Sequence, residues 1–209
     1  MTYKYIFVAG TPGSKWSSVT KNLYYSPDID RSDYSDARTY YHDAPGTMQL
    51  MHMGAYFDPG MEFGRFFSEL NKVSPLLAEK EFDRPFSHSG AIRIIKSHVF
   101  ADHIDYIKAT WPNCPIVLVH RPDDACLGWW VKCGHFDITY PDYAEYYKDL
   151  KTMATIIQKQ NAGILAATEK YSGLVPENNQ MLCDILGIKK PPAEYFQDYQ
   201  DADVSVTVI

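Results

Sequence analysis

Three short clusters of polar residues in this sequence combine side chains that can hold an anion and move a proton. The first is GTPGSKWSS, residues 10–18, which follows an apolar run directly. A turn that leads into a helix presents free backbone N–H groups and the positive end of the helix dipole. Lys15 adds a charge, and Ser17 and Ser18 add hydroxyl donors, so this segment is predicted to bind phosphate. The alternative is an ordinary strand-to-helix turn in which Ser14 caps the helix.

The spacing in this segment differs from the Walker A pattern GxxxxGK[ST] of P-loop kinases. Lys15 follows Gly10 one position too early, and Ser14 stands in place of the second glycine. Trp16 stands where the pattern has Ser or Thr. A kinase of this class also needs an Asp at the end of a buried strand to hold Mg²⁺, and none is found there. A small-molecule kinase is therefore an alternative that the sequence disfavours.

The second cluster, Lys96-Ser97-His98, follows the apolar run at residues 91–95. If the chain stays extended, Lys96 and His98 lie on the same side of it. A histidine can take a proton from a hydroxyl near neutral pH, and a lysine can stabilise charge on a transferring group or a leaving phosphate. The alternative is a surface lysine beside a histidine that is hydrogen-bonded at a strand end.

The third cluster, His120-Arg121-Pro122-Asp123-Asp124, follows the apolar run at residues 115–119. The planar fork of an arginine suits a phosphate. A proline followed by two acids is typical of the start of a helix. The alternative is an ion pair between Arg121 and one of the two acids.

Apolar strands that alternate with helical segments predict an α/β fold of three layers with a central, mostly parallel sheet. The expected strands are residues 5–9, 91–95, 115–119 and 164–168. The expected helices are residues 16–25, 61–71, 101–111, 123–133, 142–161 and 177–186. Ligands bind beyond the carboxyl ends of strands in such sheets, which is where the three clusters lie.

The acids of the irregular segment 26–60 are predicted to form a solvated loop, namely Asp28, Asp30, Asp33 and Asp36.

Length and composition narrow the class of protein. The chain has 209 residues, 45% of them apolar, which suits a single domain, predicted at 1–190 and followed by an acidic tail at 191–209. The net charge of −6 argues against nucleic-acid binding through a basic face. The four cysteines form no CxxC pair, so no metal site is predicted.

Without a signal peptide or a long apolar run, we expect a cytoplasmic protein that does not enter the membrane. The oligomeric state is not indicated.

Together, the three clusters resemble the PAPS-dependent sulfotransferases, in the same order and at similar strand ends. In that family a loop of the type PKSGTTW holds the 5′-phosphosulfate of 3′-phosphoadenosine-5′-phosphosulfate (PAPS). The similar residues here are Pro12, Gly13, Ser14, Lys15, Trp16, Ser17 and Ser18. Lys96-Ser97-His98 is similar to the family's Lys-Thr-His segment, and residues 120–124 are similar to its Arg-Asn-Pro-x-Asp segment. Residues 164–168 and 181–188 look like the strand and the Leu-Gly-terminated helix that close the family's domain.

The resemblance implies a P-loop NTPase-like sulfotransferase fold. It also implies that a sulfuryl group passes from PAPS to a hydroxyl of a small molecule or carbohydrate, leaving 3′-phosphoadenosine-5′-phosphate (PAP). In this interpretation His98 is the general base, and Lys96 and Lys15 stabilise charge. Besides the loop, the implied PAPS contacts are His120, Arg121 and Gly128. A non-catalytic nucleotide-binding or interaction protein of the same fold is the alternative.

Several positions depart from the family's pattern. The loop lysine, Lys15, stands two places later than in the family's loop. Gly13 takes the position in which the family has its lysine. With the prolines aligned, His120 falls where the arginine is expected and Arg121 follows it. Gly128 takes the place of a serine that contacts the 3′-phosphate.

The acceptor is expected to bind against an irregular aromatic stretch at residues 52–63, between the loop and the second cluster. The predicted contacts are His52, Tyr56, Phe57 and Met61. Aromatic faces suit a sugar ring or a flat phenol. The alternative is a loop that simply covers the core.

Overall fold

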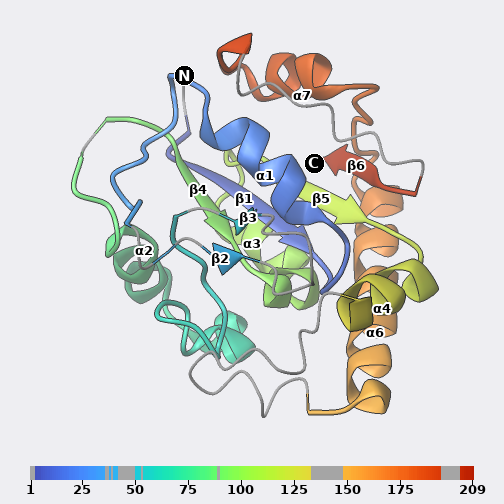
Figure 1. Ribbon diagram of the computed structural model, residues 1–209. Coiled ribbons are helices and arrows are strands. Elements are labelled where there is room, and N and C mark those ends of the chain that lie inside the picture. Colours follow the sequence, from blue (N-terminus) through green and yellow to red (C-terminus); the bar gives the residue numbers. More distant parts are fainter. Residues whose placement is uncertain are drawn as a thin grey trace.

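Four strands form the central sheet of the computed structural model, in the order β4-β1-β5-β6 (Figure 1). They are β4 (Arg93–Lys96), β1 (Tyr5–Gly10), β5 (Ile116–His120) and β6 (Ser205–Val208). β1 pairs in parallel with β4 and with β5, and β6 runs antiparallel to β5. The structure describes residues 3–35, 38, 40–41, 50–52, 54–88, 90–132, 148–193 and 203–209. The expected α/β fold with a mostly parallel sheet is confirmed.

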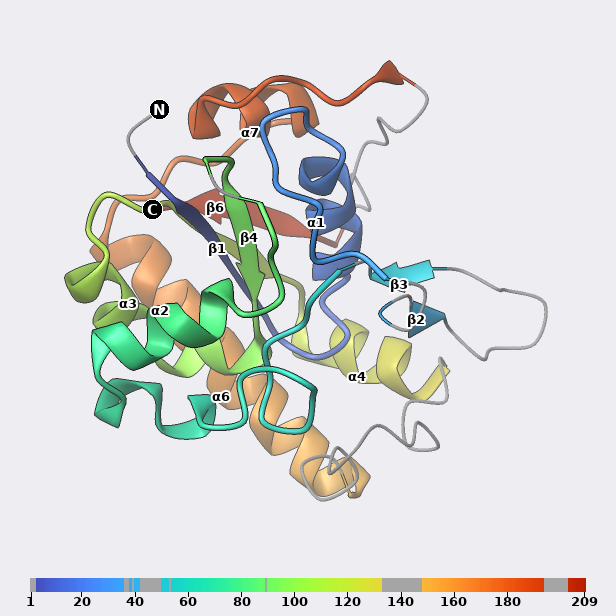
Figure 2. The ribbon, with the colours of Figure 1, turned by 90° about the vertical axis from the view of Figure 1, so that its left-hand side faces the viewer.

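Helices lie on both faces of this sheet (Figures 1 and 2). The α-helices are α1 (Trp16–Tyr24), α2 (Pro75–Asp83), α3 (Ile104–Thr110), α4 (Asp123–Lys132), α6 (Leu150–Lys170) and α7 (Asn179–Leu186). Two 3₁₀ helices are η2 (Phe67–Lys72) and η3 (His98–Asp102), and the short strands β2 (Tyr40–Tyr41) and β3 (Leu50–His52) pair separately. The expected helices at 16–25 and 123–133 are confirmed within one residue.

β1 is buried along its whole length, and its alternating side chains supply two cores. Ile6 and Val8 pack with α1, α7 and the first turns of α6. Phe7 and Ala9 pack with α2, α3 and the far end of α6. The second core is aromatic, and Phe82 of α2 lies at its centre, with its ring centroid 5.4 Å from that of Phe7. Burial on both faces explains why the apolar runs of the sequence predicted these strands well.

Residues 164–168 lie inside α6, so the strand predicted there is wrong. Ile164 and Ala167 are buried while Leu165 is exposed, which is the spacing of a helix, and Thr168 donates a hydrogen bond to the carbonyl of Ile164. A short apolar run does not by itself distinguish a strand from a buried helix. Of the strand and helix expected at this end of the domain, only the helix is present: α7 ends at Leu186, and Gly187 follows it with a left-handed φ of 62°.

Between Met61 and Asp83 the helices also differ from the prediction. Instead of one helix at 61–71, the chain forms the 3₁₀ helix η2 and then α2. The start of α2 carries the usual signals, because Ser74 accepts a hydrogen bond from the N–H of Leu77 and Pro75 takes the first helical position. These signals were present in the sequence.

The end of the segment predicted to be an acidic tail belongs to the domain. Residues 205–208 form β6, and Val206 and Val208 are buried in the same core as Ile6. Val208 also pairs with Leu174, so the outer edge of β6 is partly covered. The boundary at residue 190 therefore does not mark the end of the fold, while residues 194–202 lie outside the described residues.

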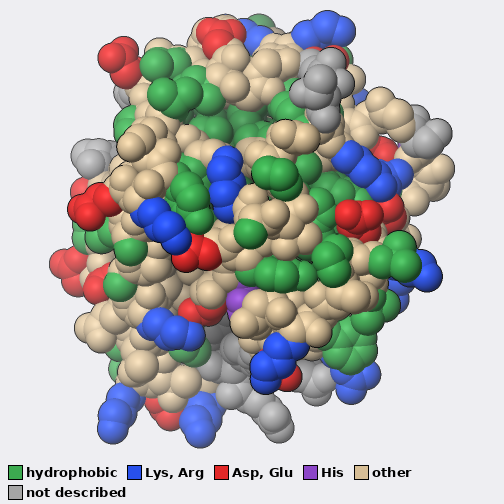
Figure 3. Space-filling model, turned by 180° about the vertical axis from the view of Figure 1, so that it is seen from behind, with side chains coloured by type: hydrophobic (Ala, Val, Ile, Leu, Met, Phe, Trp, Pro, Cys, Tyr) green, Lys and Arg blue, Asp and Glu red, His purple; other side chains and the backbone are tan. Residues whose placement is uncertain are grey.

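No helix within the described ranges is both long enough and apolar enough to span a bilayer. The face opposite to the view of Figure 1 carries acidic and basic side chains side by side (Figure 3). Its charges are therefore not gathered into a single basic patch of the kind that binds a nucleic-acid backbone.

We predict that Val206→Ala lowers the free energy of unfolding by about 2 kcal/mol, because it removes two buried carbon atoms and leaves a cavity. Ser205→Ala, at the exposed neighbouring position, should change it by less than about 0.5 kcal/mol. Urea unfolding followed by circular dichroism measures both. Equal stability of Val206→Ala and the parent protein would mean that residues 205–208 are a detached tail.

Candidate functional site

The loop that joins β1 to α1, residues 11–15, is held in a conformation that few residues can adopt. Gly13 has a φ of 80°, and a Cβ at this position would lie 2.1 Å from the carbonyl oxygen of Cys126. Lys15 is also left-handed, with a φ of 62°, and it is the N-cap of α1. The alternative in which Ser14 caps the helix is not found, since the N-cap of α1 is Lys15 and it makes no side-chain cap hydrogen bond. The loop is therefore strained and packed closely against α4.

Two buried donors at this loop have no hydrogen-bond partner among the described residues. They are the Ser14 hydroxyl and Nε of Arg121. Arg121 does not pair with Asp123 or Asp124: its Nη1 donates to the carbonyl of Gly13 at 3.2 Å. Unsatisfied buried donors destabilise a protein, so these two donors beside one helix N-terminus are the candidate ligand contacts of this loop.

His98 joins the second cluster to this loop. Its Nδ1 is hydrogen-bonded to the carbonyl oxygen of Gly10, the last residue of β1. A carbonyl only accepts, so Nδ1 carries the proton and Nε2 keeps its lone pair. The ring packs between Trp16 and Tyr56, with centroid distances of 4.5 Å and 5.6 Å. Burial lowers the pKa of His98, which favours the neutral imidazole that a general base requires.

Asp58 holds the second cluster in place, and the sequence analysis did not find it. Its carboxylate accepts hydrogen bonds from the N–H of His98 at 3.0 Å and from the Tyr56 hydroxyl at 2.7 Å. It also accepts from the hydroxyl of Ser97 and, more weakly, from the N–H of Val99. Asp58 is 39 to 41 residues in sequence from the donors at Ser97, His98 and Val99, so no local pattern pointed to it.

Lys96 lies on the α1 side of the sheet, as His98 does, and is 3% exposed. Burial lowers its pKa to about 8, and the negative charge of Asp33 opposes this shift. Asp33 is itself buried and accepts hydrogen bonds from the Tyr24 hydroxyl and the N–H of Ala55. Burial raises the pKa of Asp33. Burial thus favours the neutral amine of Lys96, and the charge of Asp33 favours the ammonium form.

The prediction of a solvated acidic loop at residues 28–36 is wrong for two of its acids. Asp33 is buried beside Tyr24, and Asp30 is buried and accepts hydrogen bonds from Ser32. Arg93 lies 3.5 Å from Asp30 and pairs with Asp83 as well. Asp36 lies outside the described residues. Asp30 therefore connects this irregular segment to β4, and Asp33 connects it to α1 and to Ala55.

The remaining loop residues are placed as follows. Pro12 is buried, Ser17 is half-buried and Ser18 is exposed, with its N–H donating to the carbonyl of Lys15. Trp16 is only 5% exposed, so both of its ring faces are covered.

The third cluster is only partly brought to the loop. Arg121 faces it, but His120 turns toward β6, where its Nδ1 lies 3.5 Å from the hydroxyl of Ser205. Gly128 is exposed, and a Cβ there would meet nothing within 4 Å.

The predicted acceptor residues are more deeply buried than expected. Phe57 is fully buried and stacks in the aromatic core, so it is not a surface that an acceptor can contact. Tyr56 and Met61 are also buried, and only Tyr56 touches His98. The side chain of His52 lies outside the described residues. A groove of about 390 Å³ lies elsewhere, between η3, α3 and α6.

No protein-family model, no curated protein and no solved structure matches this chain. The geometry of the loop and of the two strand ends is therefore what supports a function.

We predict that Asp58→Asn lowers the pKa of His98 further, because the charge of Asp58 favours the imidazolium form. It should also cost about 1–3 kcal/mol of stability, since buried donors lose a charged acceptor. NMR titration of the His98 ring and urea unfolding measure the two effects. Glu169→Gln, an exposed change of the same kind in α6, is the control. An unchanged or higher His98 pKa would contradict the assignment.

Proposed function

We propose that this protein transfers a sulfuryl group from PAPS to a hydroxyl acceptor. The observation that carries the proposal is the hydrogen bond between His98 and Gly10. This hydrogen bond joins a neutral, buried imidazole to the end of β1. The loop that follows β1 has the two unpartnered donors beside it, the Ser14 hydroxyl and Nε of Arg121. An anion site and a proton acceptor in direct connection are what such a transfer requires.

In the proposed reaction, the loop N–H groups, the Ser14 hydroxyl and Arg121 bind the phosphates of the donor. The acceptor oxygen attacks sulfur, and an S–O bond forms as the bond from sulfur to the bridging phosphosulfate oxygen breaks. Nε2 of His98 takes the proton of the acceptor hydroxyl, and PAP leaves. Lys15 and Lys96 stabilise the charge that develops on the oxygens around sulfur and on the bridging oxygen.

The strand order supports the proposal of a P-loop-like sulfotransferase fold. The loop follows β1, whose parallel neighbours β4 and β5 lead into the other two clusters. All three clusters therefore lie at one edge of the sheet.

We also propose a cytoplasmic location, supported by the free thiols of Cys114, Cys126 and Cys183.

One observation favours the alternative of a nucleotide-binding protein without transferase activity. Lys96 and His98 are only 3% and 4% exposed, and Trp16 and Tyr56 cover the histidine ring. Transfer needs the acceptor hydroxyl to reach Nε2 of His98, so Tyr56 or its neighbours must move when the acceptor binds.

Isothermal titration calorimetry with PAP tests the donor site, with ATP and Mg²⁺ as the competing ligand. We expect PAP to bind in the micromolar range and ATP not to bind. Arg121→Ala should weaken PAP binding at least tenfold, because it removes charge-assisted hydrogen bonds to a phosphate. Arg65→Ala, which removes one exposed arginine on a different segment, should leave the affinity unchanged.

The other outcomes separate the alternatives. Binding of ATP alone would favour the kinase. Binding of neither ligand by a folded protein would reject the sulfotransferase and favour an interaction protein of the same fold.

A further inference from the structure

A buried asparagine interrupts the apolar face of α6. Ile157 and Ile164 of this face are buried, and Asn161 lies between them with only 3% of its surface exposed. Ile157 belongs to the core on the α1 side of the sheet, and Ile164 belongs to the aromatic core on the other side. Asn161 therefore occupies a position at which the spacing of the helix predicts an apolar residue.

The side-chain amide of Asn161 holds the turn between β5 and α4. Its Nδ2 donates to the carbonyl oxygen of Arg121 at 2.8 Å and to Oδ1 of Asp123 at 2.6 Å. A carbonyl and a carboxylate only accept, so the amide presents its nitrogen to them. The amide oxygen of Asn161 is buried without a hydrogen-bond partner among the described residues. Because an unsatisfied buried oxygen is destabilising, stability alone does not account for an amide at this position.

Asp123 is the acid that would otherwise neutralise Arg121. Only Pro122 separates the two residues, and pairs of arginine with a carboxylate are strong, charge-assisted hydrogen bonds. The carboxylate of Asp123 is instead bound to the amide of Asn161. One side chain of α6 therefore holds both the backbone of Arg121 and its nearest competing charge.

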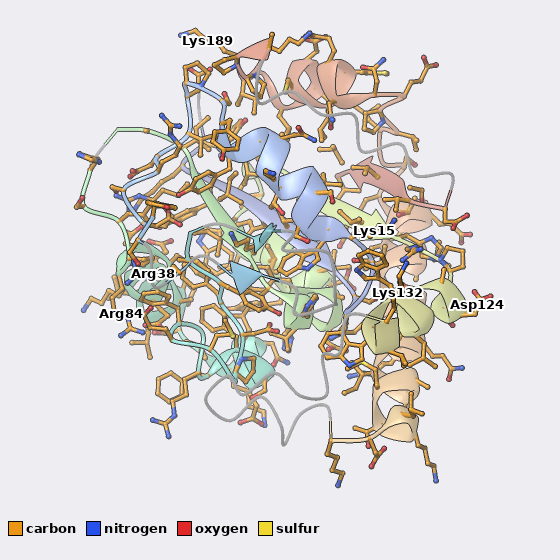
Figure 4. The ribbon with its side chains drawn as sticks, viewed as in Figure 1. Lys15, Arg38, Arg84, Asp124, Lys132 and Lys189 are labelled. Carbon is orange, nitrogen blue, oxygen red and sulfur yellow. The ribbon has the colours of Figure 1, made fainter. Side chains whose placement is uncertain are left out.

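The guanidinium of Arg121 is directed to the loop as a result. Nη1 donates to the carbonyl of Gly13, and Nε is buried without a partner among the described residues. The acid recorded within ion-pair distance of Arg121 is Asp203, whose largely exposed carboxylate lies 3.9 Å from Nη2. A pair this long and exposed contributes little. Asp124, the other acid at the start of α4, points away from Lys15 and the loop (Figure 4).

We propose that Asn161 is a positioning residue that keeps Arg121 available to an anion by binding the competing carboxylate of Asp123. The same amide fixes the carbonyl of Arg121, so the guanidinium extends toward the loop. This inference rests on the proposed function, in which the anion is a phosphate of the donor. Asn161 acts on that phosphate only through Arg121 and Asp123.

Asn161→Leu tests the proposal, because leucine branches at the same carbon and removes both N–H donors. The freed carboxylate of Asp123 should turn to Arg121, and PAP binding measured by calorimetry should weaken about tenfold, as in Arg121→Ala. Asp123→Asn in the Asn161→Leu background removes the competing charge and should return the affinity to within about threefold of the parent value. A loss caused by disturbed packing would not be rescued by this second change.

Gln160→Leu is the matched control. Gln160 precedes Asn161 in α6, is also 3% exposed, and likewise has an amide oxygen without a partner among the described residues. Its Nε2 donates to Asp102 of η3 at 3.2 Å and not to the turn after β5, so its loss should leave PAP affinity unchanged. Asn161→Ala, which favours the helix, replaces Asn161→Leu if the latter does not fold, as urea unfolding shows.

Crystal structures of the parent protein and of Asn161→Leu, both without ligand, test the positioning independently of PAP. The variant should place a guanidinium nitrogen of Arg121 within about 4 Å of the Asp123 carboxylate, unlike the parent protein.

The outcomes distinguish this inference from the function on which it rests. If PAP binds as tightly to Asn161→Leu as to the parent protein, the inference is wrong and the donor site stands. The same holds if Asp123→Asn does not rescue the affinity, or if Arg121 does not turn to Asp123 in the variant. If the parent protein does not bind PAP, the proposed function fails, and the two crystal structures still decide whether Asn161 controls Arg121.

Discussion

The hydrogen bond from His98 to the carbonyl of Gly10 depends on the register of two parallel strands. Val8 of β1 pairs with Lys96 of β4, so Gly10 and His98 each lie two residues farther along neighbouring chains. This register brings the loop after β1 and the segment after β4 to the same edge of the sheet. A shift by one residue would turn Lys96 and His98 to the other core. The candidate site therefore depends on the buried side chains of β1 and β4, which fix that register from both faces.

Burial gives the polar groups at this edge the properties that their chemistry needs. The pKa of His98 is lowered, so its imidazole is neutral, and the pKa of Lys96 is lowered to about 8. Each group has a carboxylate near it: Asp58 faces the backbone of His98, and Asp33 interacts with Lys96. Isolated buried charges are strongly destabilising, so the charge of Asp33 offsets that of Lys96, while Asp58 is stabilised by hydrogen bonds from residues 97–99. The left-handed conformations of Gly13 and Lys15 add local strain at the same place, a combination common at functional sites.

The sequence predicted the parts of this structure that local patterns determine. Three apolar runs became β1, β4 and β5 because strands buried on both faces need no polar alternation. Residues 164–168 were misread because a short apolar run fits a helix equally well, and residues 205–208 were assigned to a tail because their partner β5 is distant in sequence. Asp58 was not identified because its role comes from tertiary contacts with η3, which lies about forty residues away in sequence.

The central claim is that the loop and His98 form one site. Nitrogen-15 NMR of the His98 ring, recorded with and without saturating PAP, tests it most directly. The account predicts a neutral ring with the proton on Nδ1, and a clear change in the Nε2 resonance when PAP binds, because the ligand's phosphates change the field beside the loop. A proton on Nε2 in the free protein, or His98 resonances that do not change while PAP binds, would contradict the account.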